Sequence, residues 1–134
     1  MNTKIIYFQN HGDSRGNLTA LEYNKELPFV VRRVYYIYNV KDKIRRGFHA
    51  HKKLNQVLIA IAGSCKILVD DGTKKEVVVL DSPDKGLFVG EDIWREMYDF
   101  SDNAVLVSLA SEEYNESDYI RDYNEFIKYI GEKK

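Results

Sequence analysis

Short runs of apolar residues, many of them alternating with polar residues, recur along most of the chain. Alternation with a period of two is typical of β-strands, because successive side chains of a strand point to opposite faces. The run 57–62 is apolar at every position, which predicts a strand buried on both faces, and Gly63 ends it in a turn. The whole pattern predicts about ten short strands, at residues 4–8, 18–23, 29–40, 46–51, 57–62, 66–69, 76–80, 87–89, 94–100 and 104–109.

Turn-forming residues separate these runs. The segments 13–17 and 70–73 are rich in Asp, Gly, Ser, Asn and Thr, and the second one reads as a hairpin turn between two strands. Regularly spaced short strands of this kind are typical of a β-sandwich or a β-barrel. We therefore expect an all-β fold for most of the chain.

Near residue 116 the apolar period changes from that of a strand to that of a helix. This pattern predicts a C-terminal α-helix over about residues 116–131, with Ser117 or Asp118 as its cap. Its apolar face would pack against the β-structure. The apolar positions that recur at helical spacing are Tyr119, Ile120, Tyr123, Phe126, Ile127 and Ile130.

Composition limits the classes of protein to consider. The 134 residues suffice for one domain over 1–134, and a net charge of -1 gives no basic surface for nucleic acid. No apolar run approaches the ~20 residues that span a membrane, and the N-terminus is too polar for a signal peptide. The single cysteine, Cys65, excludes an internal disulfide. We expect a cytoplasmic protein without nucleic-acid or membrane partners.

Two histidines in the predicted strand 46–51 are the first candidates for chemistry. His49 and His51 stand two residues apart, so a strand would project both imidazoles to one face. Imidazole is the commonest metal ligand and also titrates near neutral pH. The pair therefore indicates metal ligands or acid–base catalysts, with an ordinary half-buried pair as the alternative.

The spacing of His49, His51, Gln56 and Gly63 resembles the first motif of the cupins. That motif usually carries Glu where Gln56 stands, and an amide is a weaker, uncharged metal ligand. The second cupin motif usually supplies a further histidine, but the matching region 90–97 contains none. We therefore expect a cupin-like barrel that has lost its metal and kept its histidines for acid–base chemistry.

Cationic and aromatic residues extend the candidate site. Arg33 and Tyr35 share one face of the predicted strand 29–40, opposite Val34, Tyr36 and Tyr38. A guanidinium and a phenol in one cavity would suit an anionic, hydroxyl-rich ligand, although an edge strand facing solvent is the alternative. Further candidates are Arg15 and Arg46, which lie near turns, and Trp94, which would form either a pocket wall or part of the core.

As a set, these segments resemble the dTDP-4-keto-6-deoxyglucose 3,4-ketoisomerases over essentially the whole chain. The resemblance implies an all-β, RmlC-like cupin jelly-roll barrel without metal or cofactor, and a homodimer with an exchanged N-terminal strand. It also implies transfer of the keto group of dTDP-4-keto-6-deoxy-D-glucose from C4 to C3, ahead of transamination to a 3-amino sugar for surface glycans. The matching segments are DSRGNL (13–18), RVYY (33–36), RGFHAHK (46–52), QVL (56–58), GSC (63–65), LDSP (80–83), WREM (94–97) and DYIR (118–121).

The same resemblance implies roles for individual residues. His49 and Tyr35 would move protons, with His51 assisting or holding the enediolate oxygen, and which group is acid and which is base stays open. Some members carry histidine where Arg95 stands, so both the gluco and the galacto 3-keto product stay open. The implied substrate-binding residues are Arg15, Arg33, Arg46, Lys52, Gln56, Trp94, Arg95 and Met97.

Three alternatives stay open. A 3,5-epimerase on the same fold would use a single histidine base with an Asp partner and a Tyr acid. The paired histidines, and the lack of an evident His–Asp pair in the sequence, favour the ketoisomerase. A metal-dependent cupin oxygenase is disfavoured by Gln56 and by the missing second-motif histidine. A non-catalytic sugar-binding cupin would need the same pocket.

Overall fold

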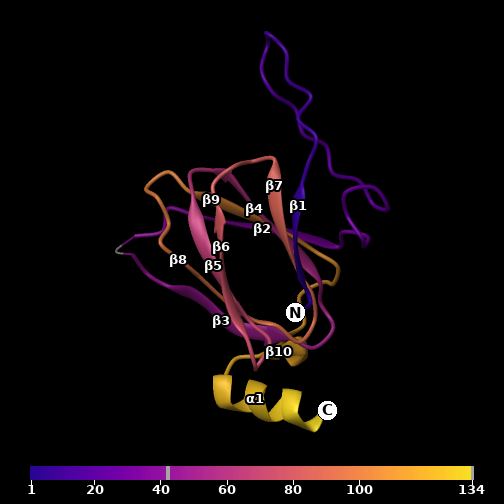
Figure 1. The fold of residues 1–134 in the computed structure, drawn as a ribbon, viewed down its shortest axis with the longest axis vertical. Coiled ribbons are helices and arrows are strands. Elements are labelled where there is room, and N and C mark those ends of the chain that lie inside the picture. Colours follow the sequence, from indigo (N-terminus) through magenta and orange to yellow (C-terminus); the bar gives the residue numbers. More distant parts are fainter. Residues whose placement is uncertain (42, 134) are drawn as a thin grey trace.

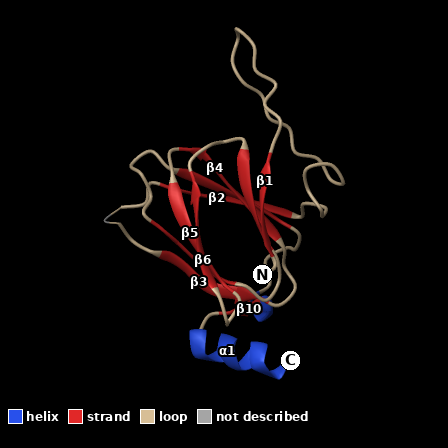
Figure 2. Cartoon of the chain, in the orientation of Figure 1, coloured by secondary structure: helices blue, strands red, loops and turns tan. Residues whose placement is uncertain are grey.

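The computed structural model describes residues 1–41 and 43–133, and shows two antiparallel sheets that face each other (Figures 1 and 2). The strand orders are β1-β7-β4-β9-β2 and β10-β3-β8-β5-β6, with five strands in each sheet. The charged residues at 41–45 predict a loop, and one of them, Asp42, lies outside the described residues. The strands are β1 (Thr3–Tyr7), β2 (Arg33–Tyr38), β3 (Arg46–His51), β4 (Gln56–Ala62), β5 (Cys65–Asp70), β6 (Lys75–Leu80), β7 (Lys85–Val89), β8 (Trp94–Tyr98), β9 (Val105–Ala110) and β10 (Tyr119–Ile120).

The core forms because the strands turn their apolar faces inward. In β5 the alternation places Cys65, Ile67 and Val69 in the space between the two sheets. The central strand β4 is buried on both faces, as its continuous apolar run predicts. Its Leu58 side faces the main core, and its Val57 side packs under the segment that follows β1. The expected all-β barrel is confirmed.

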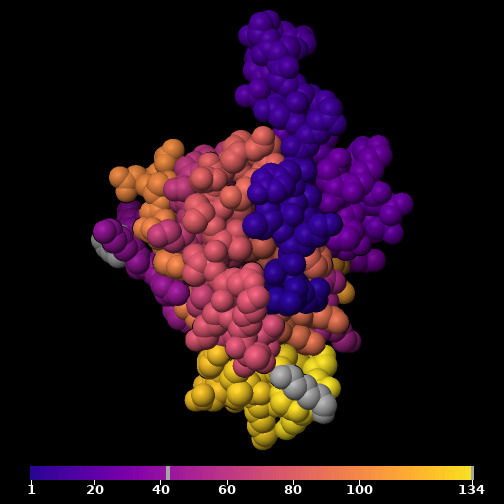
Figure 3. Space-filling model, viewed as in Figure 1, coloured from indigo at the N-terminus to yellow at the C-terminus, as the bar shows by residue number. Residues whose placement is uncertain are grey.

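The strand predicted at 18–23 is wrong. The segment after β1 forms an arm that projects beyond the barrel, at the end opposite the helix (Figures 1 and 3). Leu18 and Tyr23 are 60% and 59% exposed there. Bridges between Asp13 and Gly16 and between Tyr23 and Leu27 are too isolated to build a strand. The apolar residues alternate as in a strand, but none of the strands in residues 1–41 and 43–133 pairs with them.

The C-terminal helix α1 spans Tyr123–Glu132 and begins later than predicted. Asp122 caps it by accepting a hydrogen bond from the backbone N–H of Glu125. Residues Glu116–Asp118 form a short 3₁₀ turn (η1), and β10 follows, paired with β3. The backbone of this segment pairs with a strand, so its apolar residues do not continue the helix. No helix of the described residues is long and apolar enough to cross a membrane.

Candidate active site

A cavity of about 390 Å³ lies where the edge strand β2 of one sheet approaches β3, β8 and β10 of the other. Three of its lining residues are arginines, and among the described residues no carboxylate lines it. Such a rim favours an anionic ligand. The lining residues are Arg33, Tyr35, Tyr36, Ile37, Arg46, Gly47, His49, Met97, Tyr119 and Arg121.

An irregularity in β3 turns the histidines into this cavity. The register with β8 shifts between Gly47 and His49, and both Gly47 (φ +90°) and Phe48 (φ +57°) adopt left-handed backbone conformations. A bulge of this kind bends a strand and redirects the side chains that follow it. Phe48 remains 43% exposed, whereas His49 and His51 are 8% and 1% exposed. The predicted common face of the two histidines therefore points inward.

His49 presents an unpaired imidazole to the cavity. Neither of its ring nitrogens hydrogen-bonds to any of the described residues, although both are buried. Burial, followed by the positive charge of Arg95, lowers the pKa of His49 to about 3, so its imidazole is neutral near neutral pH. Because the ring is neutral and both nitrogens lack protein partners, one lone pair is available to a ligand in the cavity.

His51 stands behind His49 and is held by a carboxylate. The two rings meet edge to face with centroids 4.9 Å apart, and Nδ1 of His51 lies 3.0 Å from Oδ2 of Asp118. Burial and the charge of Arg95 lower the pKa of His51, so its neutral ring donates Nδ1–H to Asp118. No His–Asp pair is evident from the sequence, but His51 and Asp118 form one, so the expected lack of such a pair does not count against the epimerase.

Arg33 and Tyr35 enter the cavity from β2, as the alternation predicts. Arg33 donates from Nη2 to the hydroxyl of Tyr119 at 3.2 Å, and its guanidinium lies 5.2 Å from the centre of the Tyr35 ring. The Nε atom of Arg33 is buried and has no partner among the described residues. Arg33 therefore keeps a free donor beside the cavity.

Arg95 and Gln56 lie beneath the cavity rather than on its wall. Both are fully buried, and Nη1 of Arg95 donates to Oε1 of Gln56. Burial lowers the pKa of Arg95 to about 10, which leaves its guanidinium charged near neutral pH. Gln56, which stands where the first cupin motif usually has Glu, thus bonds to Arg95, and the guanidinium of Arg95 places a fixed positive charge inside the barrel.

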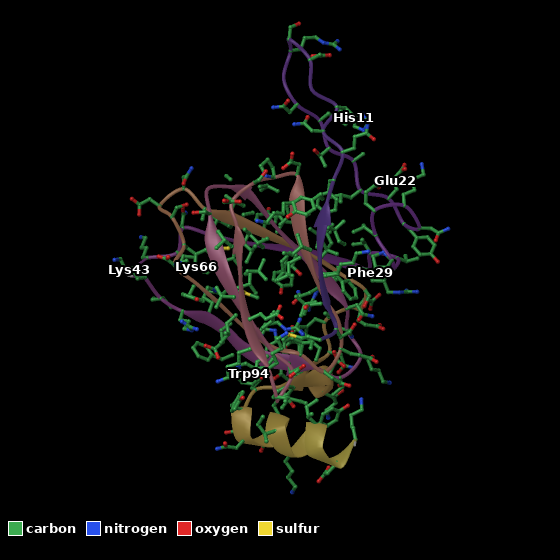
Figure 4. The ribbon with its side chains drawn as sticks, in the orientation of Figure 1. His11, Glu22, Phe29, Lys43, Lys66 and Trp94 are labelled. Atoms are coloured by element: carbon green, nitrogen blue, oxygen red, sulfur yellow. The ribbon has the colours of Figure 1, made fainter. Side chains whose placement is uncertain are left out.

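Three predicted binding residues lie away from the cavity of their own chain. Arg15 sits on the projecting arm, paired with Asp13 at 2.7 Å. The ammonium of Lys52 lies 5.8 Å from the centre of the Tyr129 ring. Trp94 is 3% exposed and packs against α1, close to Phe126, so it belongs to the core at the helix end of the barrel (Figure 4). Of the other predicted binding residues, Arg33, Arg46 and Met97 line the cavity.

Sequence reasoning missed the contribution of β10 to this site. Tyr119 lines the cavity, and its ring centre lies 4.3 Å from that of His51 and 5.1 Å from that of His49. Arg121 adds a cation to the rim, and its guanidinium lies 4.3 Å from the Tyr119 ring centre. The available signal was the segment 118–121, which belongs to the family resemblance but was assigned to the helix. No cluster of three His, Cys, Asp or Glu residues suited to a metal ion occurs in residues 1–41 and 43–133.

Two facing sheets around paired neutral histidines and an arginine-rich rim define a cupin built for acid–base chemistry on an anionic ligand. The chain belongs to the FdtA family, since the family model described as "FdtA: WxcM-like, C-terminal" matches residues 1–131. This match confirms the resemblance found in the sequence. The rmlC epimerase of Mycobacterium tuberculosis superposes on this chain with a TM-score of 0.78, over 90% of this chain and 68% of its own. The two sequences are 21% identical, and the superposition confirms the RmlC-like fold.

Characterised relatives are similar over nearly the whole chain. The TDP-4-oxo-6-deoxy-alpha-D-glucose-3,4-oxoisomerase of Aneurinibacillus thermoaerophilus is 52% identical over 98% of this chain and 94% of its own. A 3,4-ketoisomerase from Helicobacter canadensis is 50% identical, with a TM-score of 0.95 over 98% of both chains. QdtA, a sugar 3,4-ketoisomerase from Thermoanaerobacterium thermosaccharolyticum, was solved with TDP and is 43% identical, with a TM-score of 0.95 over 98% of this chain and 96% of its own. A mutant of QdtA was solved with TDP-4-keto-6-deoxyglucose.

Proposed function

We propose that this protein is a 3,4-ketoisomerase of dTDP-4-keto-6-deoxy-D-glucose. The observation that carries the proposal is the neutral, unpaired imidazole of His49, which faces an arginine-rimmed cavity beside the phenol of Tyr35. The 52% identity to a TDP-4-oxo-6-deoxy-alpha-D-glucose-3,4-oxoisomerase supports the choice of substrate and reaction. The enzyme would therefore be an isomerase that uses acid–base catalysis.

The reaction needs only proton transfers. A base removes the proton from C3, the electron pair forms the C3–C4 double bond, and the C4 oxygen is protonated to give an enediol. The C3 hydroxyl then loses its proton, its oxygen forms the new carbonyl, and C4 receives a proton. Substrate and product are isomers, so no oxidant or reductant is consumed, and positioned acid and base groups suffice.

We assign the base at C3 to His49 and the proton exchange with the sugar oxygen to Tyr35. His49 is the histidine that lines the cavity, and neither of its ring nitrogens has a partner among the described residues. His51, fixed by Asp118, would support His49 or contact the enediolate oxygen. The ring of Tyr119 lies against both histidines and would form the wall of the cavity next to them.

Arginines would hold the diphosphate of the substrate. Arg33, Arg46 and Arg121 line the same cavity. A guanidinium group can donate two parallel hydrogen bonds to two oxygens of one phosphate. Arg15 lies on the arm, so its predicted part in binding requires that the arm reach the cavity of a second chain. The roles of Lys52 and Trp94 predicted from the family resemblance would also need contacts beyond those of this single chain.

We propose that the protein forms a homodimer. The outer face of β2 exposes Val34, Tyr36 and Tyr38, each more than half exposed, at the edge of a sheet, and Tyr36 also borders the cavity. The far part of the projecting arm extends beyond the barrel of its own chain (Figure 3). In a dimer the arm would lie on the second chain, and β1, which pairs with β7 within this chain, would exchange places with the β1 of that chain. Val34→Glu should then yield a monomer in sedimentation velocity, whereas Val77→Glu, an equally exposed position on β6, should remain dimeric.

The product would be a 3-keto sugar nucleotide, the type of compound that an aminotransferase converts to a 3-amino sugar. Such sugars would serve surface glycans such as lipopolysaccharide or S-layer glycan. We place the reaction in the cytoplasm, in keeping with a single, buried cysteine that has no disulfide partner.

Proton NMR of dTDP-4-keto-6-deoxyglucose mixed with the protein in deuterated water, with EDTA present, tests the function. We expect a 3-keto sugar that carries deuterium, and its C4 coupling constants will distinguish the gluco from the galacto product. Binding without any chemical change would overturn the proposal and indicate a sugar-binding cupin.

A 3,5-epimerase is the second candidate, because the His51–Asp118 pair is the arrangement that such an enzyme would use. The same spectra separate the two reactions. Deuterium at C3 and C5 with the ketone still at C4 would establish the epimerase and exclude the ketoisomerase.

A further inference from the structure

A chain of buried polar side chains runs from the cavity into the barrel and joins four strands, β2, β4, β8 and β9. The amide nitrogen Nε2 of Gln56 lies 3.2 Å from the hydroxyl of Tyr35 and 2.6 Å from Oγ of Ser108. The amide oxygen Oε1 of Gln56 accepts a hydrogen bond from Arg95. Gln56, Arg95 and Ser108 are all 0% exposed, so only Tyr35 reaches the cavity.

Arg95 determines which way the Gln56 amide points. A guanidinium has donors and no acceptor, so the atom of Gln56 that faces it must be the oxygen. Arg95 cannot easily turn away, because its Nη2 donates to the carbonyl oxygen of Ile93 at 2.8 Å and to that of Gly90 at 3.3 Å. Its Nε also donates to Ile93 at 3.3 Å. The amide of Gln56 therefore has one orientation.

This orientation fixes the direction of the Tyr35 hydroxyl. The two hydrogens on Nε2 of Gln56 are directed at Tyr35 and at Ser108, so the phenol oxygen of Tyr35 is an acceptor on that side. A phenol that accepts on one side has its own hydrogen free for another direction. Tyr35 lines the cavity, so that direction is toward the ligand.

We propose that Gln56, held by Arg95, is a positioning residue that makes Tyr35 present its hydroxyl proton to the substrate. The inference rests on the proposed function, in which Tyr35 exchanges a proton with a sugar oxygen. It changes the role expected for Gln56 from contact with the substrate to control of the residue that makes the contact. The same N–H of Gln56 stabilises negative charge on the phenol oxygen after the proton has left.

A merely structural Gln56 would act differently. A buried amide that only satisfies Arg95 would affect folding stability when it is replaced, and its effect on turnover would be independent of Tyr35. A positioning residue acts through Tyr35, so its effect on turnover must disappear when the phenol is absent. The coupling between the two positions therefore separates the two roles.

Gln56→Glu is the informative variant. It keeps the size of the side chain and gives Arg95 an anionic partner, so the fold is expected to survive. A carboxylate can only accept, so it would draw the Tyr35 proton away from the cavity. Gln56→Met removes the donor altogether and is a second variant, should the carboxylate disturb folding. Asn124→Asp, an equivalent change from an amide to a carboxylate at an exposed position of α1, controls for the added charge.

We expect kcat to fall about 10–100-fold in Gln56→Glu and in Gln56→Met, with KM changed by less than about threefold. In a Tyr35→Phe background, either substitution should cause little further loss. Asn124→Asp should retain wild-type kcat. Full kcat in the Gln56 variants, or losses that multiply with that of Tyr35→Phe, would overturn the inference.

A measurement that does not depend on turnover separates this inference from the proposed function. In ¹⁵N–¹H NMR spectra the Gln56 side-chain amide should give two protected hydrogens, one shifted by Tyr35→Phe and the other by Ser108→Ala. If neither substitution moves them, Gln56 does not orient Tyr35. If both shifts appear but wild-type protein converts no sugar nucleotide, the orientation stands, whereas the proposed function and the catalytic use of the orientation fail.

Discussion

Nδ1 of His51 lies 3.0 Å from Oδ2 of Asp118, although 67 residues separate them in the chain. Asp118 also accepts the backbone N–H groups of Lys53 at 2.7 Å and Leu54 at 3.3 Å. One carboxylate therefore fixes both the tautomer of a buried histidine and the loop that follows its strand. In this tautomer Nε2 of His51 keeps its lone pair.

Asp118→Asn should lower turnover about 10–100-fold, the range seen when a residue that orients a site histidine is lost. An asparagine offers a single oxygen for three donors, so either His51 or the loop loses its acceptor. Steady-state kinetics will measure the loss. Asp122→Asn is the matched control, because Asn caps a helix as well as Asp does and turnover should be unchanged. Equal activity of both variants would contradict the role of Asp118.

The buried histidines should make the protein less stable as the pH falls. The pKa of His49 is lowered from 6.5 to about 3 by burial, and that of His51 is lowered by the same cause. The unfolded chain therefore binds protons below about pH 6.5 that the folded chain does not, so stability is present above that pH and is lost on acidification toward about pH 3. Each histidine contributes a slope of about 1.4 kcal/mol per pH unit.

Urea unfolding of wild type and His49→Asn between about pH 6 and pH 4 will test this slope. Both proteins lose stability to their common carboxylates, so the difference between them isolates His49. We expect the variant to show the shallower dependence by about 1.4 kcal/mol per pH unit. Parallel curves would mean that His49 titrates alike in the folded and unfolded chains.

Gly47→Ala should destabilise the protein by about 1–3 kcal/mol and reduce turnover. A Cβ at Gly47, whose φ is +90°, would lie 2.9 Å from the carbonyl oxygen of Arg95 and 3.2 Å from Cα of Glu96. The backbone of the bulge would have to shift. Because the bulge sets the direction of the His49 side chain, the shift should move His49 and reduce turnover. Urea unfolding and kinetics measure both effects.

The control for this substitution is Gly131→Ala in α1, where an added Cβ meets nothing within 4 Å. Alanine has a higher helix propensity than glycine. The free energy of unfolding of this variant should therefore rise by about 0.5–1 kcal/mol, and its turnover should be unchanged. A Gly47→Ala protein as stable and active as wild type would show that the bulge does not need glycine.

Arg33→Lys should weaken TDP binding about tenfold, equivalent to about 1.4 kcal/mol, with little change in folding stability. Lysine cannot reproduce the planar fork that bonds Tyr119 while leaving a second donor, the buried Nε, beside the cavity. Isothermal titration with TDP measures the affinity. Arg32→Lys, the same change at the exposed neighbour on the chain, should bind as wild type does. Unchanged affinity in Arg33→Lys would exclude Arg33 from phosphate binding.

Local rules account for the parts of the site that the sequence predicts. The common face of His49 and His51, and the alternation of Arg33, Val34 and Tyr35, follow from the period of two in a strand. Neither depends on what the strand packs against. The bulge was not predicted. It lies before His49, so it does not change the two-residue spacing that puts His49 and His51 on one face.

Long-range pairing accounts for the parts that the sequence does not predict. Asp118 and Tyr119 reach the histidines only because β10 pairs with β3, and a strand of two residues has no periodicity to detect. The helical spacing that continues through Ile120 assigned these residues to the wrong element. At 18–23 the opposite occurred, since the strand pattern is present but the partner strand is not.

The lateness of β10 in the chain has a consequence for biosynthesis. The N-terminal part of a chain leaves the ribosome first. Strands β1 to β9 are therefore available for folding before Tyr119 and Arg121 emerge. Until then His49 and His51 lack the strand that pairs with β3, and a nascent barrel would leave both imidazoles open to water and to stray ligands. The cavity therefore cannot be completed until β10 has been synthesised and has paired with β3, however early β1 to β9 fold.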